Sequence, residues 1–531
     1  MVGAHGDGRH ARGDRRRRRL PEAADRRRER RSRAHCGDAG RRLVNAFGEL
    51  SQIGPAVSLL GGAVVVLGAD LVTPRRAPIR LLALAAIAVA LLYAVTQLLG
   101  DGSRQAFGGA IVVDGFGLYF TFLLLAISVA VVVASSGGLQ RIDQPAEFYA
   151  LMLTSTASMI VLAQARELIT IFVALETTSI AQFVLAGIGR DDRSSEAGLK
   201  YLLTGAVAAA VLLYGFAFLF GLAGTTSLVG IGEVIRTGPE GLRLAVIFAF
   251  VLVAAGFGFK MAIVPFHAWV PDVYQGAPTL VTTFLAVASK AAGFAIVLRV
   301  FYTGFGGPDT FVAQDWARMF AVFAAISMTF GNLAAMAQSD VKRLLGYSSI
   351  AQAGNIAVGL AAVAAGSTLG PSAVLFFLGT YVATNLGAFI SVLFVSSRIG
   401  SDEVADYAGL IRRSPGVAIV LTLCLLSLTG IPPTAGFLAK LYVFNSAIQA
   451  QQPWLIGLVI VAVLNTAISA FYYLRWARTM LLDAPKEEGP FRPSLAIGGV
   501  LAAAAVGVLL FGFAPAPLID AARRAAMALL Q

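Results

Sequence analysis

The stretch GFGFKMAIVPFHAWVPDVYQGAP (residues 256–278) places a lysine, a histidine, an aspartate and three prolines inside a strongly hydrophobic chain. The prolines cannot continue a regular helix, because proline lacks a backbone N–H and clashes with the preceding turn. Within a membrane, backbone groups freed by such a break are tolerated only around a protein-lined, hydrated cavity. The stretch therefore predicts a broken transmembrane helix that carries a buried lysine, Lys260, beside the break.

The composition indicates a membrane protein along most of the chain. Of 531 residues, 57% are hydrophobic and 14% are charged, and the mean hydropathy is +0.75. A soluble chain carries about 25% charged residues. Runs of roughly 18 to 25 apolar residues, each long enough to cross a bilayer, recur along the chain. We predict an all-α polytopic membrane protein with about fourteen helices, near residues 54–72, 79–99, 116–136, 147–164, 168–189, 198–223, 242–275, 278–301, 315–338, 344–364, 371–397, 415–450, 454–480 and 494–513.

A second interrupted helix resembles the first. SLTGIPPTAGFLAKLYVF (residues 427–444) also joins glycine and proline to one lysine, Lys440. The two broken helices are the seventh and twelfth in order, and an offset of five helices reverses orientation. Interrupted helices at matching positions of two halves are typical of inverted repeats around a transport site. We predict repeats at 141–301 (helices 4–8) and 302–482 (helices 9–13), after helices 1–3 at 43–140 and before helix 14 and a tail at 483–531.

Charge divides the chain into a basic tail and alternating loops. Residues 1–42 hold fifteen arginines and six acidic residues, which predicts either a disordered basic arm or a start site assigned too early. Further along, basic residues gather in alternate loops, among them those at 75–80, 141, 190–193, 342–343 and 398–413. The positive-inside rule places these loops in the cytoplasm.

The lysines are the most informative ionisable residues, since only six occur in the chain. Lys200, Lys260, Lys290 and Lys440 fall within predicted helices, while Lys342 and Lys486 fall in predicted loops. A buried ammonium can release its proton, whereas a guanidinium cannot. Charged groups inside a membrane usually mark a substrate or ion pathway. The pattern favours proton transfer, although each lysine also has a structural interpretation as a helix cap or ion-pair partner.

Other polar residues have competing interpretations. Glu176 supplies a carboxylate in the fifth helix, for proton transfer or for a static hydrogen bond to a nearby Ser or Thr. Lys200 lies four residues after Glu196, the spacing of an ordinary surface ion pair. His267 is either a proton relay or a structural donor. Asp114 and Asp272, near the membrane interfaces, are expected to be solvated or to cap a helix, and Trp269 is expected to lie in the interfacial aromatic belt.

Motifs for redox cofactors and metals are missing from the sequence. There is no CxxC series, no paired-histidine haem pattern and no GxGxxG after a strand. We expect no cofactor and no metal site on this chain.

Four motifs resemble one family. VPFHAWVPDVYQGAP after GFK, ASKAAGF, FGNLAAMAQSDVKRLLGYSSIAQAG and SLTGIPPTAGFLAKLYVF are similar to the subunit N family of bacterial NADH–quinone oxidoreductase, respiratory complex I, the counterpart of mitochondrial subunit 2. The VYQGAP ending resembles subunit N more than its antiporter-like paralogues. The resemblance covers roughly residues 50 to 513.

The resemblance implies a fold of fourteen helices with two inverted five-helix repeats, and a role for each matched residue. Glu176 and Lys260 look like the paired residues of the fifth and seventh helices, and Lys200 like the additional lysine of the sixth. Lys290 resembles the connecting residue and Lys440 the exit-side lysine, while His267 fits the histidine after the break.

The expected function is therefore proton translocation in the membrane arm of complex I, in the bacterial plasma membrane. NADH, FMN, iron–sulfur clusters and quinone are expected on other subunits, and the partners are expected to be other membrane-arm subunits, lipid, protons and internal water, without nucleic acid. The alternative is a subunit of a multi-subunit sodium/proton antiporter without redox coupling.

Overall fold

The structure is a computed structural model that describes residues 3, 48–72, 76–100, 102–137, 142–486 and 489–530, without the side chains of 76–78. Apart from Gly3, the predicted basic tail lies outside the described residues. Residues Gly54–Gln531 form one compact unit.

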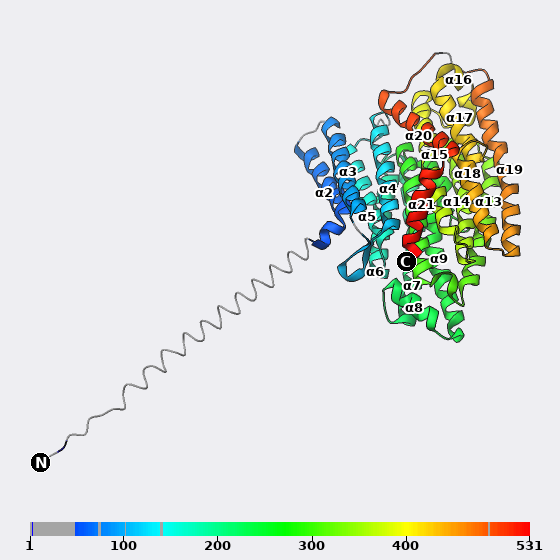
Figure 1. Cartoon of the computed structure of the whole chain (residues 1–531). Coiled ribbons are helices and arrows are strands. Elements are labelled where there is room, and N and C mark those ends of the chain that lie inside the picture. Colours follow the sequence, from blue (N-terminus) through cyan, green and yellow to red (C-terminus); the bar gives the residue numbers. More distant parts are fainter. Residues whose placement is uncertain are drawn as a thin grey trace. The chain divides into compact units, whose positions relative to one another are not determined.

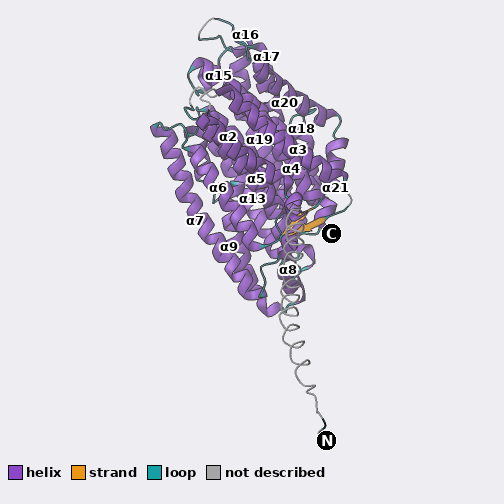
Figure 2. Ribbon diagram, turned by 90° about the vertical axis from the view of Figure 1, so that its left-hand side faces the viewer, coloured by secondary structure: helices purple, strands orange, loops and turns teal. Residues whose placement is uncertain are grey.

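This unit is a bundle of helices that lie side by side (Figure 2), with α2 and α3 along one edge and α19 along the opposite edge (Figure 1). The α-helices are α2 (Gly54–Val72), α3 (Arg76–Leu99), α4 (Gly115–Ala134), α5 (Pro145–Gln164), α6 (Leu168–Ala186), α7 (Asp192–Ala223), α8 (Leu228–Thr237), α9 (Arg243–Met261), α10 (Trp269–Gly276), α11 (Thr279–Phe284), α12 (Lys290–Arg299), α13 (Ala313–Met336), α14 (Val341–Ala364), α15 (Gly370–Ile399), α16 (Leu410–Arg413), α17 (Pro415–Thr429), α18 (Ala435–Gln449), α19 (Pro453–Leu482), α20 (Leu495–Phe513) and α21 (Ala516–Leu530). The predicted all-α polytopic membrane fold is confirmed.

Twelve helices among the described residues are long and apolar enough to cross a membrane, and α17 is a shorter apolar helix. Every predicted span contains helix in the structure. The count of fourteen crossings and the inverted repeats stay predictions, because α14 and the pair α17–α18 lie outside those twelve.

The core lies around the segment Thr279–Gly304 and around α15. In the apolar 18-residue stretch of each, 100% and 94% of the residues are buried. A helix that is hydrophobic on all sides belongs in the interior of a bundle. By contrast, 28% or less of the residues are buried in the corresponding stretches of α2, α7, α19 and α20. The centre of the bundle therefore holds the helix that begins with Lys290.

Both predicted breaks are present and are built alike. After α9, Ala262 adopts a left-handed backbone (φ 60°) and the Val264–Pro265 peptide is cis. After α17, Gly430 is left-handed (φ 90°) and the Pro432–Pro433 peptide is cis. Gly436 then lets α18 start against α17, since a Cβ there would collide with the carbonyl oxygen of Ser427.

A buried ion pair fixes the central helix to the N-terminal part of the unit. The guanidinium of Arg299, at the end of α12, is fully buried and donates two hydrogen bonds of 2.9 Å to the carboxylate of Asp114. Its Nε donates to the Ala163 carbonyl at 2.9 Å. Asp114 also caps α4, as expected, by accepting from Gly117 N at 2.7 Å. α12 is thus tied to both α4 and α5.

Several local features differ from the sequence prediction. Lys342 does not lie in a loop: it belongs to the first turn of α14 and is 4% exposed. The expectation for Trp269 is wrong, because its ring is buried, stacks on Tyr201 at 4.4 Å and donates Nε1–H to the Phe259 carbonyl. A hairpin of strands β1 (Arg104–Ala106) and β2 (Ile111–Val113) and the final helix α21 were not predicted.

Candidate functional site

Lys260 occupies the last turn of α9, directly before the first break, and is 3% exposed. Its Nζ donates a hydrogen bond of 3.1 Å to Oε1 of Gln182, on α6. Gly293 of α12 packs so closely that an added Cβ would lie 3.2 Å from the Lys260 carbonyl carbon. The ammonium is therefore held by a neutral oxygen between three helices.

Gln182 is the centre of this first cluster. Its Oε1 accepts from Lys260, from the Tyr201 hydroxyl at 3.1 Å and from the Ser289 hydroxyl at 3.0 Å. Its Nε2 donates to Ser155 Oγ at 3.2 Å. Ser289 directly precedes Lys290 in the chain. The amide of Gln182 therefore contacts both Lys260 and the residue next to Lys290.

Glu176 lies on the same helix as Gln182 but does not contact Lys260. No hydrogen bond or ion pair within 4.0 Å joins the Glu176 carboxylate to another described residue, although its charge interacts with that of Lys260. The side chain is half-buried on α6. The pairing implied by the family resemblance is thus not formed in this structure.

Lys290 begins α12 and follows a π-helical turn, Leu285–Ser289. The side chain is 2% exposed, and its Nζ donates to both the carbonyl and the hydroxyl of Ser349, on α14. The same hydroxyl accepts a hydrogen bond of 3.2 Å from Tyr381, on α15. The ammonium of Lys290 therefore contacts a hydroxyl group that is itself bonded to a second hydroxyl, and it contacts no carboxylate among the described residues.

A small cavity of about 10 Å³, lined by both polar and apolar residues, lies between Tyr381 and Lys440. Gln352, Thr384 and Ser427 also line it, and the last two share a hydrogen bond of 3.0 Å. Its volume is about that needed for one water molecule, and its walls supply the polar partners that a buried water requires. Lys290 and Lys440 are thus separated by hydroxyl groups and room for water.

Lys440 is 5% exposed and lies one turn after the second break. Its Nζ donates to the Thr429 carbonyl at 2.9 Å and to Thr466 Oγ1 at 3.3 Å. The Thr429 carbonyl is freed by the end of α17, so the break itself supplies an oxygen for the ammonium. The second sequence motif predicted a lysine beside the break, but not the oxygens that it contacts.

Lys200 has a different environment. Its ammonium contacts Glu196 at 2.7 Å and Asp272 at 2.8 Å, and the side chain is 45% exposed. The i,i+4 pair considered from the sequence is present, and Asp272 adds a second carboxylate. The structure does not bring Lys200 into contact with the buried lysines.

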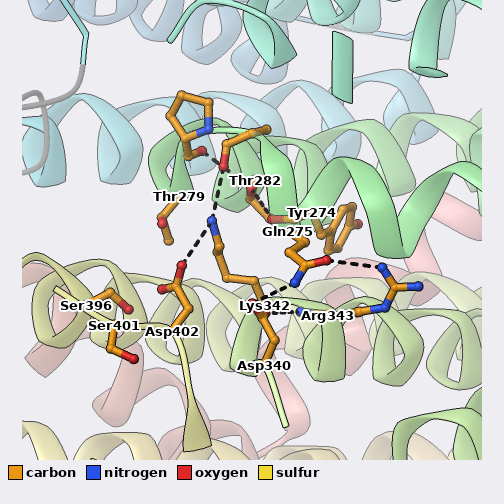
Figure 3. Close-up of polar contacts among 12 residues, drawn as sticks. Tyr274, Gln275, Thr279, Thr282, Asp340, Lys342, Arg343, Ser396, Ser401 and Asp402 are labelled. Atoms are coloured by element: carbon orange, nitrogen blue, oxygen red, sulfur yellow. Dashed lines mark hydrogen bonds and ion pairs between the residues drawn. The ribbon is translucent and has the colours of Figure 1, made fainter. Parts of the chain in front are cut away.

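A polar cluster continues from Lys200 across the same edge of the bundle. Arg343 donates to Asp272 at 2.8 Å and to Gln275 at 3.1 Å, and Gln275 donates to Asp340 at 3.0 Å. Figure 3 shows the Gln275 contacts beside Lys342, whose ammonium lies 3.4 Å from Asp402. These contacts tie α10 to the start of α14.

His267 lies in the turn between α9 and α10, half-buried, with its ring 4.7 Å from that of Phe330. Its buried Nδ1 has no hydrogen-bond partner among the described residues. No hydrogen bond joins it to Lys260 or Lys290 in the described part of the chain, so a relay role stays a prediction. No group of three or more His, Cys, Asp or Glu residues in the described part of the chain could hold a metal ion.

No pattern in the sequence pointed to the neutral side chains around the buried lysines, which are Gln182, Tyr201, Ser289, Ser349, Tyr381, Gln352 and Thr466. For two of them, the residue type itself is a usable signal. Gln182 and Gln352 are amides inside apolar helices, where an unpaired amide is costly and a buried partner is expected.

The fold, with three buried lysines that contact no carboxylate among the described residues, is that of an antiporter-like membrane subunit. The family model for the transmembrane subunits of NADH:quinone oxidoreductase and Mrp antiporters matches residues 165–466. A protein named NADH-quinone oxidoreductase subunit N from Dehalococcoides mccartyi is 42% identical over 483 residues, covering 89% of this chain and 98% of that protein. This chain belongs to the NADH-quinone oxidoreductase subunit N family, as its motifs indicated, and is a multi-pass protein of the bacterial cell membrane.

Solved structures agree with this assignment. A chain of respiratory complex I from Thermus thermophilus is 35% identical, with a TM-score of 0.72 and coverage of 88% of this chain and 98% of that one. A chain of the Mrp complex from Dietzia sp. shares the fold at 22% identity, with a TM-score of 0.77 and coverage of 91% and 97%. The sodium/proton antiporter alternative is therefore less supported than complex I.

Proposed function

We propose that this chain translocates protons in the membrane arm of complex I, through Lys260, Lys290 and Lys440. It assembles with other membrane-arm subunits of the complex. The oxidation of NADH and the reduction of quinone belong to other subunits, together with NADH, FMN, the iron–sulfur clusters and quinone.

One contrast among the six lysines carries the proposal. Lys200, Lys342 and Lys486 each contact a carboxylate, at 2.7, 3.4 and 2.6 Å. Lys260, Lys290 and Lys440, which are at most 5% exposed, contact only amide, hydroxyl or carbonyl oxygens among the described residues. A carboxylate partner favours the charged form of a lysine, whereas burial with neutral partners disfavours it. Lys260, Lys290 and Lys440, which are buried without a carboxylate partner, are thus suited to exchange protons, whereas the equally buried Lys342 is paired with Asp402.

The polar contacts suggest an order for the transfer. Gln182 and Ser289 lie between Lys260 and Lys290, where water has to carry the proton, and Ser349, Tyr381 and the small cavity lie between Lys290 and Lys440. Hydroxyl groups can both donate and accept, so they can pass a proton. An amide orients the donors but does not itself relay.

Glu176 is the proposed control element. When its carboxylate approaches Lys260, the ammonium form is favoured; when it withdraws to the position seen here, the proton is released toward Lys290. Driving one charge against the membrane potential costs about 2.3 kcal/mol per 100 mV, so this approach has to be coupled to quinone reduction elsewhere. Lys200, which contacts Asp272 on α10, and His267, which lies in the turn before α10, stay predicted participants in the proton transfer.

The test uses the assembled complex in phospholipid vesicles, with sodium present or replaced by choline. We expect NADH-driven proton uptake that is independent of sodium and is strongly reduced by Lys440→Ala. NADH–ferricyanide reduction, which does not need the membrane arm, serves as the control for assembly. Sodium-dependent proton exchange without NADH would instead support the antiporter alternative.

A further inference from the structure

A groove of about 480 Å³ lies among α2, α5 and the end of α6, and none of the residues of the lysine path lines it. Its walls are apolar, and several of their side chains are strongly exposed, from 43% for Leu60 and Leu67 to 71% for Val64. Further apolar walls come from Ala63, Leu151 and Val184. Such a groove along a transmembrane surface suits a hydrocarbon chain.

One end of the groove is polar. Gln144 and Glu147, at the start of α5, and Arg190, after α6, line it there. The positive-inside rule places this end in the cytoplasmic half of the membrane, because α5 begins and α6 ends at loops of the basic set. The groove therefore has the polarity of a phospholipid in the cytoplasmic leaflet, with its polar end at the interface and its apolar part toward the membrane interior.

The polar side chains at this end lack partners within the chain. Oε2 of Glu147 is buried and has no hydrogen-bond partner among the described residues. Neither the amide of Gln144 nor the guanidinium of Arg190 forms a hydrogen bond or ion pair with any described side chain or backbone group. A buried carboxylate oxygen without a donor is costly, so a ligand that supplies an N–H group is favoured here.

We propose that this groove binds a phospholipid with an ethanolamine head group. The ammonium donates to Glu147 and Gln144, the phosphate pairs with Arg190, and an acyl chain lies along α2 and α5. A choline head group has no N–H donor to offer, and a glycerol head group offers no cation to the carboxylate. The three polar side chains therefore select both the charge and the hydrogen-bonding capacity of the head group.

The experiment uses the assembled complex in vesicles of phosphatidylcholine and phosphatidylglycerol. The vesicles contain either a phosphatidylethanolamine with a photoactivatable acyl chain or a phosphatidylcholine with the same chain. After illumination, mass spectrometry measures the labelling of α5. We expect the ethanolamine probe to label α5 about tenfold more than the choline probe, the ratio that one charge-assisted hydrogen bond provides.

Matched variants separate specific binding from general lipid contact. Glu147→Gln should abolish the preference between the probes, and Arg190→Gln should lower labelling by both. Asp143→Asn removes an exposed acid one residue before Gln144 that does not line the groove, and should leave the preference intact. Equal labelling by both probes, a preference that survives in Glu147→Gln, or labelling of another subunit in place of α5 overturns the proposal.

Discussion

Replacing Gln182 by glutamate puts a carboxylate where a neutral oxygen now accepts from Lys260. The two side chains have nearly the same size, so the hydrogen bonds from Tyr201 and Ser289 can still reach that oxygen. The Lys260 Nζ to Gln182 Oε1 distance is 3.1 Å. At this separation, two unit charges attract by about 5 kcal/mol with an effective dielectric constant of about 20.

This attraction should hold the proton on Lys260. At about 1.4 kcal/mol per factor of ten, it disfavours release by roughly three to four powers of ten, less the cost of burying the new carboxylate. We therefore expect Gln182→Glu to assemble normally and to lose most of its NADH-driven proton translocation, with quinone reduction slowed in parallel.

The assay follows NADH–quinone turnover and acidification of inverted membrane vesicles, with ferricyanide reduction as the control for assembly. The matched variant is Gln449→Glu, because Gln449 Oε1 also accepts two hydrogen bonds, from Ser367 and Leu369, but lies outside the lysine path. Wild-type acidification in Gln182→Glu would refute the reasoning, since a lysine locked in its charged form could not pass the proton on.

Three further predictions address other parts of the molecule. Ser349→Ala removes one of the two oxygens that hold the buried ammonium of α12, which costs about 1.5–3 kcal/mol; acidification in the same vesicles should fall about tenfold or more. Asp114→Asn leaves a fully buried guanidinium without its carboxylate, and breaking such a pair costs about 3–5 kcal/mol; thermal unfolding of the purified complex should release this subunit at a clearly lower temperature. The hydrogen bond from Lys486, followed by that from Ser401, lowers the pKa of Asp406 from its ordinary value of 3.8. A lowered folded-state pKa contributes stability that is present above the unfolded pKa and lost as the pH falls through the folded one; the small stability difference between wild type and Lys486→Gln should therefore be constant from pH 8 to about pH 6 and shrink below about pH 4.

The sequence was sufficient for the features that depend on local chemistry. Runs of apolar residues predicted the helices, because their length matches the bilayer. Proline and glycine predicted both breaks, and the scarcity of lysine drew attention to Lys260, Lys290 and Lys440. Each of these inferences needs only the residues of one segment.

The features that were missed depend on contacts between distant segments. Gln182 accepts a hydrogen bond from Lys260, which is 78 positions away in the sequence. Ser349 accepts one from Lys290, which is 59 positions away. The burial of Lys342 follows from the packing of α14 against α10 and against Asp402, which no local pattern reveals. Helix α21 escaped prediction because it is short and amphipathic, so its hydropathy does not distinguish it from a tail.

The most direct test of the proposed path is Lys260→Arg, with Lys486→Arg as the matched control at an exposed ion pair. Arginine keeps the positive charge but cannot release its proton in a protein. With ferricyanide reduction intact in both variants, the proposal predicts that Lys260→Arg loses NADH-driven acidification and that Lys486→Arg retains it. Unchanged acidification in Lys260→Arg would mean that the ammonium of Lys260 only stabilises the broken helix and carries no proton.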